Sequence, residues 1–164
     1  MFDSIIGWIK APGKLSASKA KPFIPKFRYA RVVSVYDGDT FTIAAKRHFL
    51  EKAHTFKVRI AGIDCPELRT KDEEEKKFAL IAKQCVEEMI LNKIIGLDIK
   101  GYDKYGRLLA DVVCNKVNIA HMLLETGLAI TYNGKTKSQV NWYEFVKLKN
   151  PNLLIVNTSE GQSN

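Results

Sequence analysis

Cysteine is scarce in this chain of 164 residues, which has only Cys65, Cys85 and Cys114. Their number is odd and none of them stands in a Cys-x-x-Cys spacing. Both features argue against a disulfide framework and against a zinc site built on thiolates. We therefore expect the protein to work in a reducing compartment, as an intracellular and cytoplasmic protein.

Long apolar runs and internal repeats are also missing. No stretch approaches the roughly 18 consecutive apolar residues of a membrane span. The amino end lacks the basic residues, the long apolar run and the closely following cleavage site of a secretory signal. Hydrophobic residues make up 46% of the chain, which is enough for one core, so we expect a single domain with tails, and a monomer.

Charge is distributed unevenly along the chain. The 26 basic and 18 acidic residues give a net charge of +8, and most of the excess lies before residue 32. Such a basic balance favours a polyanionic partner or an anionic surface. Residues 11–26 form a basic linker rich in Pro, Gly, Ser and Lys. Five large apolar residues precede this linker and share one helical face: Phe2, Ile5, Ile6, Trp8 and Ile9.

We interpret residues 1–26 as an amphipathic and basic extension with several possible roles. It can hold nucleic acid, anchor the protein to an anionic membrane surface, act as a disordered targeting tail, or dock on the folded domain. Our hypothesis is that this extension localises the protein and takes no part in chemistry.

Apolar periodicity predicts an α+β domain over residues 27–156, followed by a disordered tail over residues 157–164. Strands are expected at 27–36, 40–45, 55–63, 94–100 and 108–114. A long helix is expected up to Ile90 with Asp72–Glu75 in its first turn, and shorter helices at 117–126 and 140–148. Five strands, with helices after the third and the fifth, predict a five-stranded OB-fold β-barrel with packed helices.

One stretch, Val58–Glu67, joins an arginine in a strand to two carboxylates in the following turn. Arg59 offers a planar fork of donors that matches a phosphate. Asp64 and Glu67 can hold a hard cation or take a proton from water, so the stretch suits phosphodiester chemistry. An ordinary strand and turn with solvated charges explains this segment equally well.

Two further segments carry candidate residues, and each has an ordinary structural explanation too. Asp39 lies in an Asp-Gly-Asp-Thr turn, for which a plain tight turn is the simpler interpretation. The loop 101–107 can grip a phosphate with Arg107 and stack a base, or it is a solvated hairpin loop. The acidic run at residues 72–75 complements a helix dipole and needs no metal to explain it.

Four motifs in the same order resemble those of the staphylococcal nuclease (thermonuclease) family. The resemblance covers about residues 31–132 and rests on Asp37-Gly38-Asp39-Thr40, Val58-Arg59 leading to Asp64-Cys65-Pro66-Glu67, Asp103-Lys104-Tyr105-Gly106-Arg107, and Gly127-Leu128-Ala129. The chain after Tyr132 departs most from the family pattern.

The resemblance implies a calcium ion held by Asp39, Asp64 and the backbone carbonyl of Cys65. It also implies that Glu67 activates or orients the attacking water, and that two guanidinium groups clamp the scissile phosphate. These belong to Arg59 and Arg107. Lys104 and Tyr105 match residues that contact nucleotide, and Tyr132 lies one residue away from a nucleotide-stacking tyrosine of the family.

The function that this resemblance implies is a calcium-dependent nuclease that hydrolyses DNA, RNA or both and leaves 3′-phosphate ends. The alternative is a noncatalytic nucleic-acid or protein-binding module on the same barrel. Such a module has no physical need for both arginines together with the three carboxylates. A structural calcium site on a basic adaptor leaves the two arginines unexplained.

Overall fold

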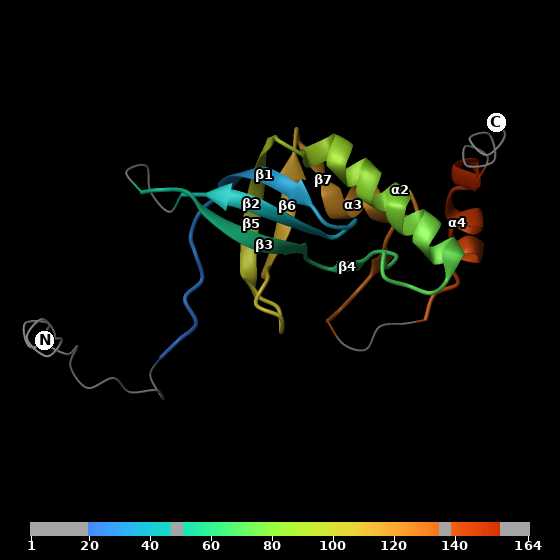
Figure 1. The fold of residues 1–164 in the computed structure, drawn as a ribbon, viewed down its shortest axis with the longest axis horizontal. Helices are drawn as coiled ribbons and strands as arrows, with labels where there is room; N and C mark the ends of the chain where they lie inside the picture. The colour runs from blue at the N-terminus through green and yellow to red at the C-terminus, as the bar shows by residue number, and fades with distance from the viewer. Residues whose placement is uncertain (1–19, 47–50, 135–138, 155–164) are drawn as a thin grey trace, which may run out of the picture.

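The computed structural model describes residues 20–46, 51–134 and 139–154, which form a β-barrel covered by three helices (Figure 1). The strands are β1 (Tyr29–Val35), β2 (Thr40–Ala45), β3 (His54–Ile60), β4 (Ile63–Asp64), β5 (Ile94–Tyr102), β6 (Leu108–Cys114), β7 (Val117–Asn118) and β8 (Ile130–Thr131). The helices are α2 (Glu73–Ile90), α3 (Ile119–Glu125) and α4 (Trp142–Lys149). No helix in these residues is both long enough and apolar enough to span a membrane.

The barrel closes through one parallel pair of strands. Strands β3, β2, β1, β5 and β6 are hydrogen-bonded in that order, and β3 also pairs with β6. In this last pair Arg59 lies opposite Leu109, two residues after Arg107. The result is the closed five-stranded barrel that the sequence predicts, with α2 after the third barrel strand and α3 after the fifth.

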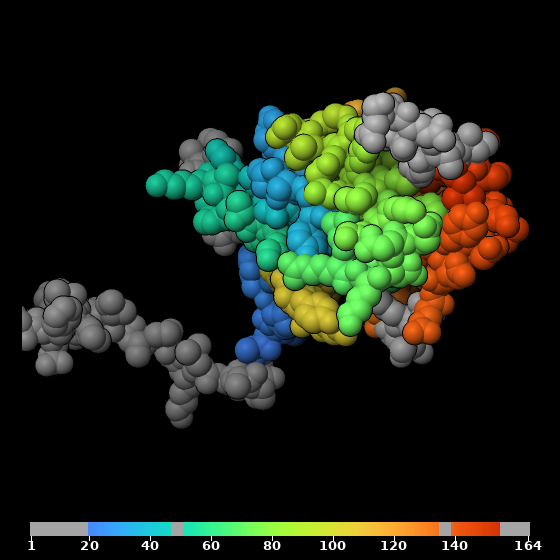
Figure 2. Space-filling model, turned by 45° about the vertical axis from the view of Figure 1, so that its right-hand side comes forward, coloured from blue at the N-terminus to red at the C-terminus, as the bar shows by residue number. Residues whose placement is uncertain are grey.

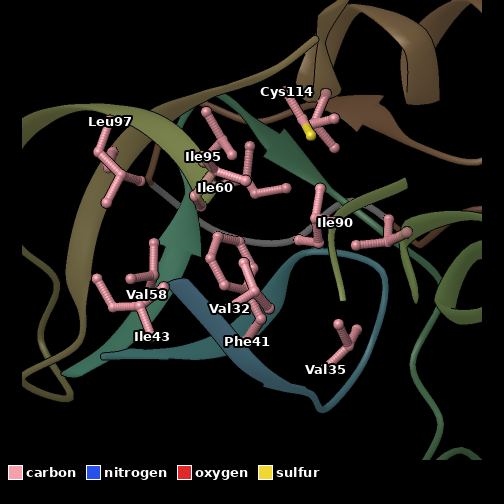
Figure 3. Close-up of a cluster of buried hydrophobic side chains, with 14 of the residues drawn as sticks. Val32, Val35, Phe41, Ile43, Val58, Ile60, Ile90, Ile95, Leu97 and Cys114 are labelled. Carbon is pink, nitrogen blue, oxygen red and sulfur yellow. The ribbon is translucent and has the colours of Figure 1, made fainter. Parts of the chain in front are cut away.

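The inner face of the barrel holds the main hydrophobic core (Figure 3). A shift in the β1–β2 register between Val32 and Ser34 turns both Val32 and Val35 inward, although an undistorted strand would place them on opposite faces. The side chains that Figure 3 labels come from all five strands of the barrel and from the end of α2: Val32, Val35, Phe41, Ile43, Val58, Ile60, Ile90, Ile95, Leu97 and Cys114.

A smaller cluster attaches α4 to the first half of α2. Phe78 of α2 packs with Trp142 and Val146 of α4, and the rings of Trp142 and Phe145 meet edge to face at 5.8 Å. Trp142 and Phe145 therefore pack, as the sequence predicts. Tyr143 differs, because it is 41% exposed and faces a pocket described below.

Several element boundaries differ from the predictions. The third strand was expected to reach Ile63, but β3 ends at Ile60 because Gly62 adopts a positive φ of 78° and the chain resumes as β4. Asp72 is the N-cap of α2 and not part of its first turn, since its carboxylate accepts the backbone N–H of Glu74 at 2.9 Å.

The helix expected at 117–126 also begins later, because its first two residues form β7. Asn118 caps α3 by accepting the backbone N–H of His121 at 3.0 Å. Residues 1–19, which hold most of the predicted extension, and the predicted tail at 157–164 lie outside the described residues. Their structure and roles therefore stay predictions.

Candidate active site

Three segments that are distant in sequence meet at one end of the barrel. They are the β1–β2 turn, the chain from the end of β3 to the start of α2, and the β5–β6 loop. Figure 2 shows these segments on one face of the molecule, in blue, green and yellow. Every predicted site residue except Tyr132 lies on one of them.

The β1–β2 turn packs closely enough on its neighbours to require glycine at residue 38. A Cβ atom on Gly38 would lie 2.9 Å from both the Cys65 Sγ and the Ala82 Cβ atoms. The backbone carbonyl of the next residue, Asp39, accepts the N–H of Ile60 at 2.9 Å. These contacts fix Asp39 beside the end of β3 and leave it only 3% exposed.

Arg59 bridges the two predicted metal-binding carboxylates. Its Nη1 atom lies 2.7 Å from Asp39 Oδ2, and its Nη2 atom lies 2.6 Å from Asp64 Oδ1 and 3.4 Å from the Ile63 carbonyl oxygen. All three charged side chains are buried, with Arg59 at 9% and Asp64 at 5% exposure. The structure thus brings Asp39, Arg59 and Asp64 together as one buried cluster.

Burial and charge have opposite effects on the pKa values in this cluster. Burial raises the pKa of Asp39 to about 7, although the guanidinium of Arg59 acts against this shift. Burial alone would lower the pKa of Arg59, but Asp39 and Asp64 outweigh it, so that the pKa of Arg59 is raised. The guanidinium therefore stays charged, and its charge is what keeps two carboxylates compatible with burial.

Arg107 joins the same cluster through a hydroxyl group. Thr40 Oγ1 donates to Asp39 Oδ1 at 2.8 Å and accepts from Arg107 Nη1 at 3.1 Å. On its other side, Arg107 Nε donates to Asp103 Oδ2 at 2.6 Å. A continuous polar chain therefore runs from Arg59 through Asp39 and Thr40 to Arg107, and it places the two arginines on one site.

Asp103 shapes the loop that carries Arg107. Its Oδ1 atom accepts the backbone N–H groups of Tyr105 and Arg107, both at 2.9 Å. Burial by itself would raise the pKa of Asp103, but the hydrogen bonds from the backbone and side chain of Arg107 and from the backbone of Tyr105 lower it. The carboxylate thus fixes both the loop and the orientation of the arginine.

The predicted nucleotide-contacting residues lie against the two arginines. The Cζ atom of Arg59 is 5.8 Å from the ring centroid of Tyr132, and that of Arg107 is 5.5 Å from the ring of Tyr105. Lys104 Nζ lies 5.1 Å from the same ring. The backbone explains the position of Tyr132, because β8 pairs with β4 and the Tyr132 N–H donates to the Gly62 carbonyl at 2.9 Å.

Glu67 is exposed and lies at the edge of a pocket of about 880 Å³. Asp64 and Cys65 also line this pocket, as do Trp142 and Tyr143 of α4. The backbone N–H of Glu67 donates to Glu75 Oε1 at 3.0 Å, which ties this segment to the first turn of α2. The acidic first turn of α2 thus has a role that the sequence did not predict.

The donor chemistry at this site suits calcium, but side chains alone do not complete a binding cage. Asp39 and Asp64 contact nitrogens of one guanidinium, so their hard oxygens converge. Across residues 20–46, 51–134 and 139–154, no group of three or more His, Cys, Asp or Glu side chains is arranged to hold a metal. Burial raises the pKa of the Cys65 thiol well above its usual value, so the neutral thiol is a poor ligand. A calcium site here requires main-chain oxygens and water in addition to the two carboxylates.

Two residues of the site were not assigned a role from the sequence. A signal for Asp103 exists, since an aspartate three residues before a glycine is typical of a turn. The role of Thr40 depends on its contact with Arg107, which is 67 residues away in sequence and reached only when the barrel closes. No local pattern predicts such a contact.

The fold and this site define an α+β OB-fold domain with a buried carboxylate–guanidinium cluster at one end of its barrel. The model of the family described as "Staphylococcal nuclease homologue" matches residues 57–150, which is more than half of the chain. The chain belongs to this family, and the resemblance in its motifs is confirmed.

Three relatives show how far the similarity extends. The chain is 34% identical to an "Uncharacterized endonuclease" of Haemophilus influenzae over 102 residues, which are 62% of this chain and 51% of the relative. It is 28% identical to a "Probable endonuclease lcl3" of Pyrenophora tritici-repentis over 149 residues, covering 77% and 55%. It is 34% identical to a "Probable endonuclease LCL3" of Colletotrichum graminicola over 132 residues, covering 68% and 48%. The chain spans about half the length of these curated relatives.

Proposed function

We propose that the protein is a nuclease that hydrolyses phosphodiester bonds in DNA or RNA. The observation that carries this proposal is the pair of fixed guanidinium groups, Arg59 and Arg107, joined through Asp39 and Thr40. The exposed Glu67 lines one pocket together with Asp64, a partner of Arg59. A noncatalytic binding module has no physical need for both arginines together with the three carboxylates. Family membership and the names of the relatives support the same reaction class.

The residues divide the work of hydrolysis between them. Glu67 takes a proton from water, whose oxygen attacks the phosphorus atom. Arg59 and Arg107 donate to the phosphate oxygens and stabilise the negative charge that accumulates there. The P–O5′ bond breaks, the 5′ oxygen leaves and takes up a proton, and the phosphate remains on the 3′ oxygen.

Arg59 retains donors for this task. A guanidinium has five N–H groups, and the ion pair with Asp39 and the hydrogen bonds to Asp64 and the Ile63 carbonyl engage three of them. These bonds hold the group in a fixed orientation, so little rearrangement is needed when an anion arrives.

Calcium is the cofactor that we propose for this site. Asp39, Asp64 and the backbone carbonyl of Cys65 would hold the ion, and hard oxygen donors support that choice. When bound, calcium supplies positive charge that neutralises the phosphate and favours attack by water.

The proposal is tested by incubating labelled single- and double-stranded DNA and RNA with the protein in calcium, in magnesium or in excess chelator. We expect cleavage in calcium, no cleavage in chelator, and 3′-phosphate ends that a phosphatase removes. Full cleavage in chelator contradicts the calcium assignment. Binding without cleavage of any substrate contradicts the enzyme and favours the binding module.

Variants then test the assigned residues. Arg107→Lys should lower kcat by on the order of 10²–10³ with a smaller change in KM, because an ammonium group lacks the guanidinium fork. Arg28→Gln is a matched control, since Arg28 is exposed and precedes the barrel. Near-normal turnover by Arg107→Lys contradicts the role of Arg107.

A further inference from the structure

A third tyrosine–arginine pair lies next to the proposed active site. Tyr36 follows β1 directly and is 49% exposed, and the Cζ atom of Arg69 lies 5.8 Å from its ring centroid. The Tyr36 N–H donates to the Thr40 carbonyl at 2.9 Å, and Arg69 comes two residues after Glu67. The pair therefore links the turn that carries Asp39 to the segment that carries Glu67.

The order of strands places this pair on one side of the arginine clamp, which is the pair Arg59 and Arg107. Arg59 of β3 lies opposite Thr40 of β2 and, on its other side, opposite Leu109 of β6. Tyr36 directly follows β1, which is the strand beyond β2, whereas Tyr105 precedes β6. Neighbouring strands are about 4.8 Å apart, so the end of β1 lies roughly 10 Å from Arg59 along the sheet. Exposed tyrosines thus flank the clamp on both sides.

The chemistry of the pair suits an unpaired nucleobase and an adjacent phosphate. Every base presents a π-face, so an exposed aromatic ring stacks bases without selecting a sequence. A guanidinium beside the ring contributes a cation–π contact and a donor fork for a phosphate oxygen. Tyr36 and Arg69 repeat the arrangement of Tyr105 with Arg107, but neither residue belongs to the polar chain of the site.

We propose that Tyr36 and Arg69 form a second nucleobase site, which stacks an unpaired base on the β1 side of the scissile phosphate. This proposal rests on the proposed nuclease function and specifies its substrate as single-stranded nucleic acid. A base inside a duplex is stacked on its neighbours and paired, so its face is not available to Tyr36. The site therefore favours single strands over duplexes.

Binding in excess chelator tests the proposal without hydrolysis. The probes are a labelled oligothymidylate of about ten nucleotides, within the usual site sizes for single strands, the same strand with one abasic residue placed at each position in turn, and a duplex of equal length. The variants are Tyr36→Ala, Tyr36→Phe and Arg69→Gln. Tyr29→Ala is the matched control, because Tyr29 is an exposed tyrosine at the other end of β1, about 20 Å along the strand.

We expect Tyr36→Ala to weaken binding of the single strand by on the order of 10-fold, with Tyr36→Phe and Tyr29→Ala close to the unaltered protein. The loss should disappear for a strand whose abasic residue occupies the site, and duplex binding should not change. Arg69→Gln should reduce the slope of log affinity against log salt by about 0.7, as one phosphate contact is lost.

Other results overturn the proposal. If Tyr36→Ala binds every probe normally, or if Tyr36→Phe loses as much affinity as Tyr36→Ala, no base stacks on this ring. A loss that is equal for single strand and duplex also contradicts it. Cleavage by the unaltered protein is measured separately from binding by the variants. If the protein cleaves nucleic acid but Tyr36→Ala binds normally, only the stacking site is rejected. If Tyr36→Ala binds more weakly but the protein cleaves nothing, only the nuclease function is rejected.

Discussion

The buried cluster makes Arg59 a determinant of stability as well as a candidate for chemistry. Asp39 and Asp64 are 3% and 5% exposed, and each lies within 2.7 Å of a nitrogen of Arg59. Replacing Arg59 by glutamine leaves two buried carboxylates without their countercharge. Removing one partner of a buried ion pair typically costs about 3–5 kcal/mol. We therefore expect Arg59→Gln to lower the free energy of unfolding by about that amount.

Thermal melting in excess chelator measures this effect. For a chain of this size, each 1 kcal/mol changes Tm by about 2–4 °C, so Arg59→Gln should melt roughly 6–20 °C lower. Arg28→Gln should stay within about 0.5 kcal/mol, because a surface substitution breaks no buried pair. If calcium binds Asp39 and Asp64, then it replaces the lost charge and should raise the Tm of Arg59→Gln more than that of the unaltered protein.

A triple variant separates charge from packing. Adding Asp39→Asn and Asp64→Asn to Arg59→Gln removes the buried charges on both sides, so much of the lost stability should return. If the triple variant is no more stable than Arg59→Gln alone, the loss comes from packing. If Arg59→Gln melts at the same temperature as Arg28→Gln, Arg59 does not balance the charge of the two buried carboxylates.

Three further variants test the supports of the site. Gly38→Ala should cost about 1–3 kcal/mol in urea unfolding, because its Cβ would lie 2.9 Å from the Cys65 Sγ atom. Hydrogen bonds from Arg107 lower the pKa of Asp103 in the folded protein. The ionised carboxylate of Asp103 therefore stabilises the fold fully above its unfolded pKa of about 4, and this stabilisation is lost as the pH falls through the lower pKa of the folded state. Urea unfolding from neutral to acidic pH should therefore show that Asp103→Asn lacks this acid-sensitive part. Trp142→Ala should cost about 3–5 kcal/mol by calorimetry, because it opens a cavity between α4 and α2.

Local sequence patterns predicted the interior of the barrel well and the strand ends less well. The strands β2 and β6 match their predicted ranges, since turn residues or charged residues bound their apolar runs. The end of β3 was predicted wrongly because Ile60 and Ile63 are both apolar and buried, so the apolar pattern of the strand continues across the turn between them. Only the positive φ of Gly62 in the structure reveals this turn.

The site shows a similar division between local and distant information. The motifs identified Asp39, Arg59 and Asp64, and the structure brings them together. Nothing in the motifs shows that Arg59 pairs with both carboxylates, because this depends on the packing of the β1–β2 turn against β3. The contact between Thr40 and Arg107 depends in turn on the parallel pairing of β3 with β6.

The two arginines are held in different ways, and this affects how their variants can be interpreted. Arg59 is buried on a strand between two carboxylates, so its replacement changes the fold and the site together. Arg107 is partly exposed on a loop and has two polar partners, Asp103 and Thr40. Its replacement leaves no pair of buried carboxylates without a countercharge. A loss of turnover in an Arg59 variant therefore reports on chemistry only where melting shows an intact fold, whereas Arg107→Lys reports on the phosphate contact more directly.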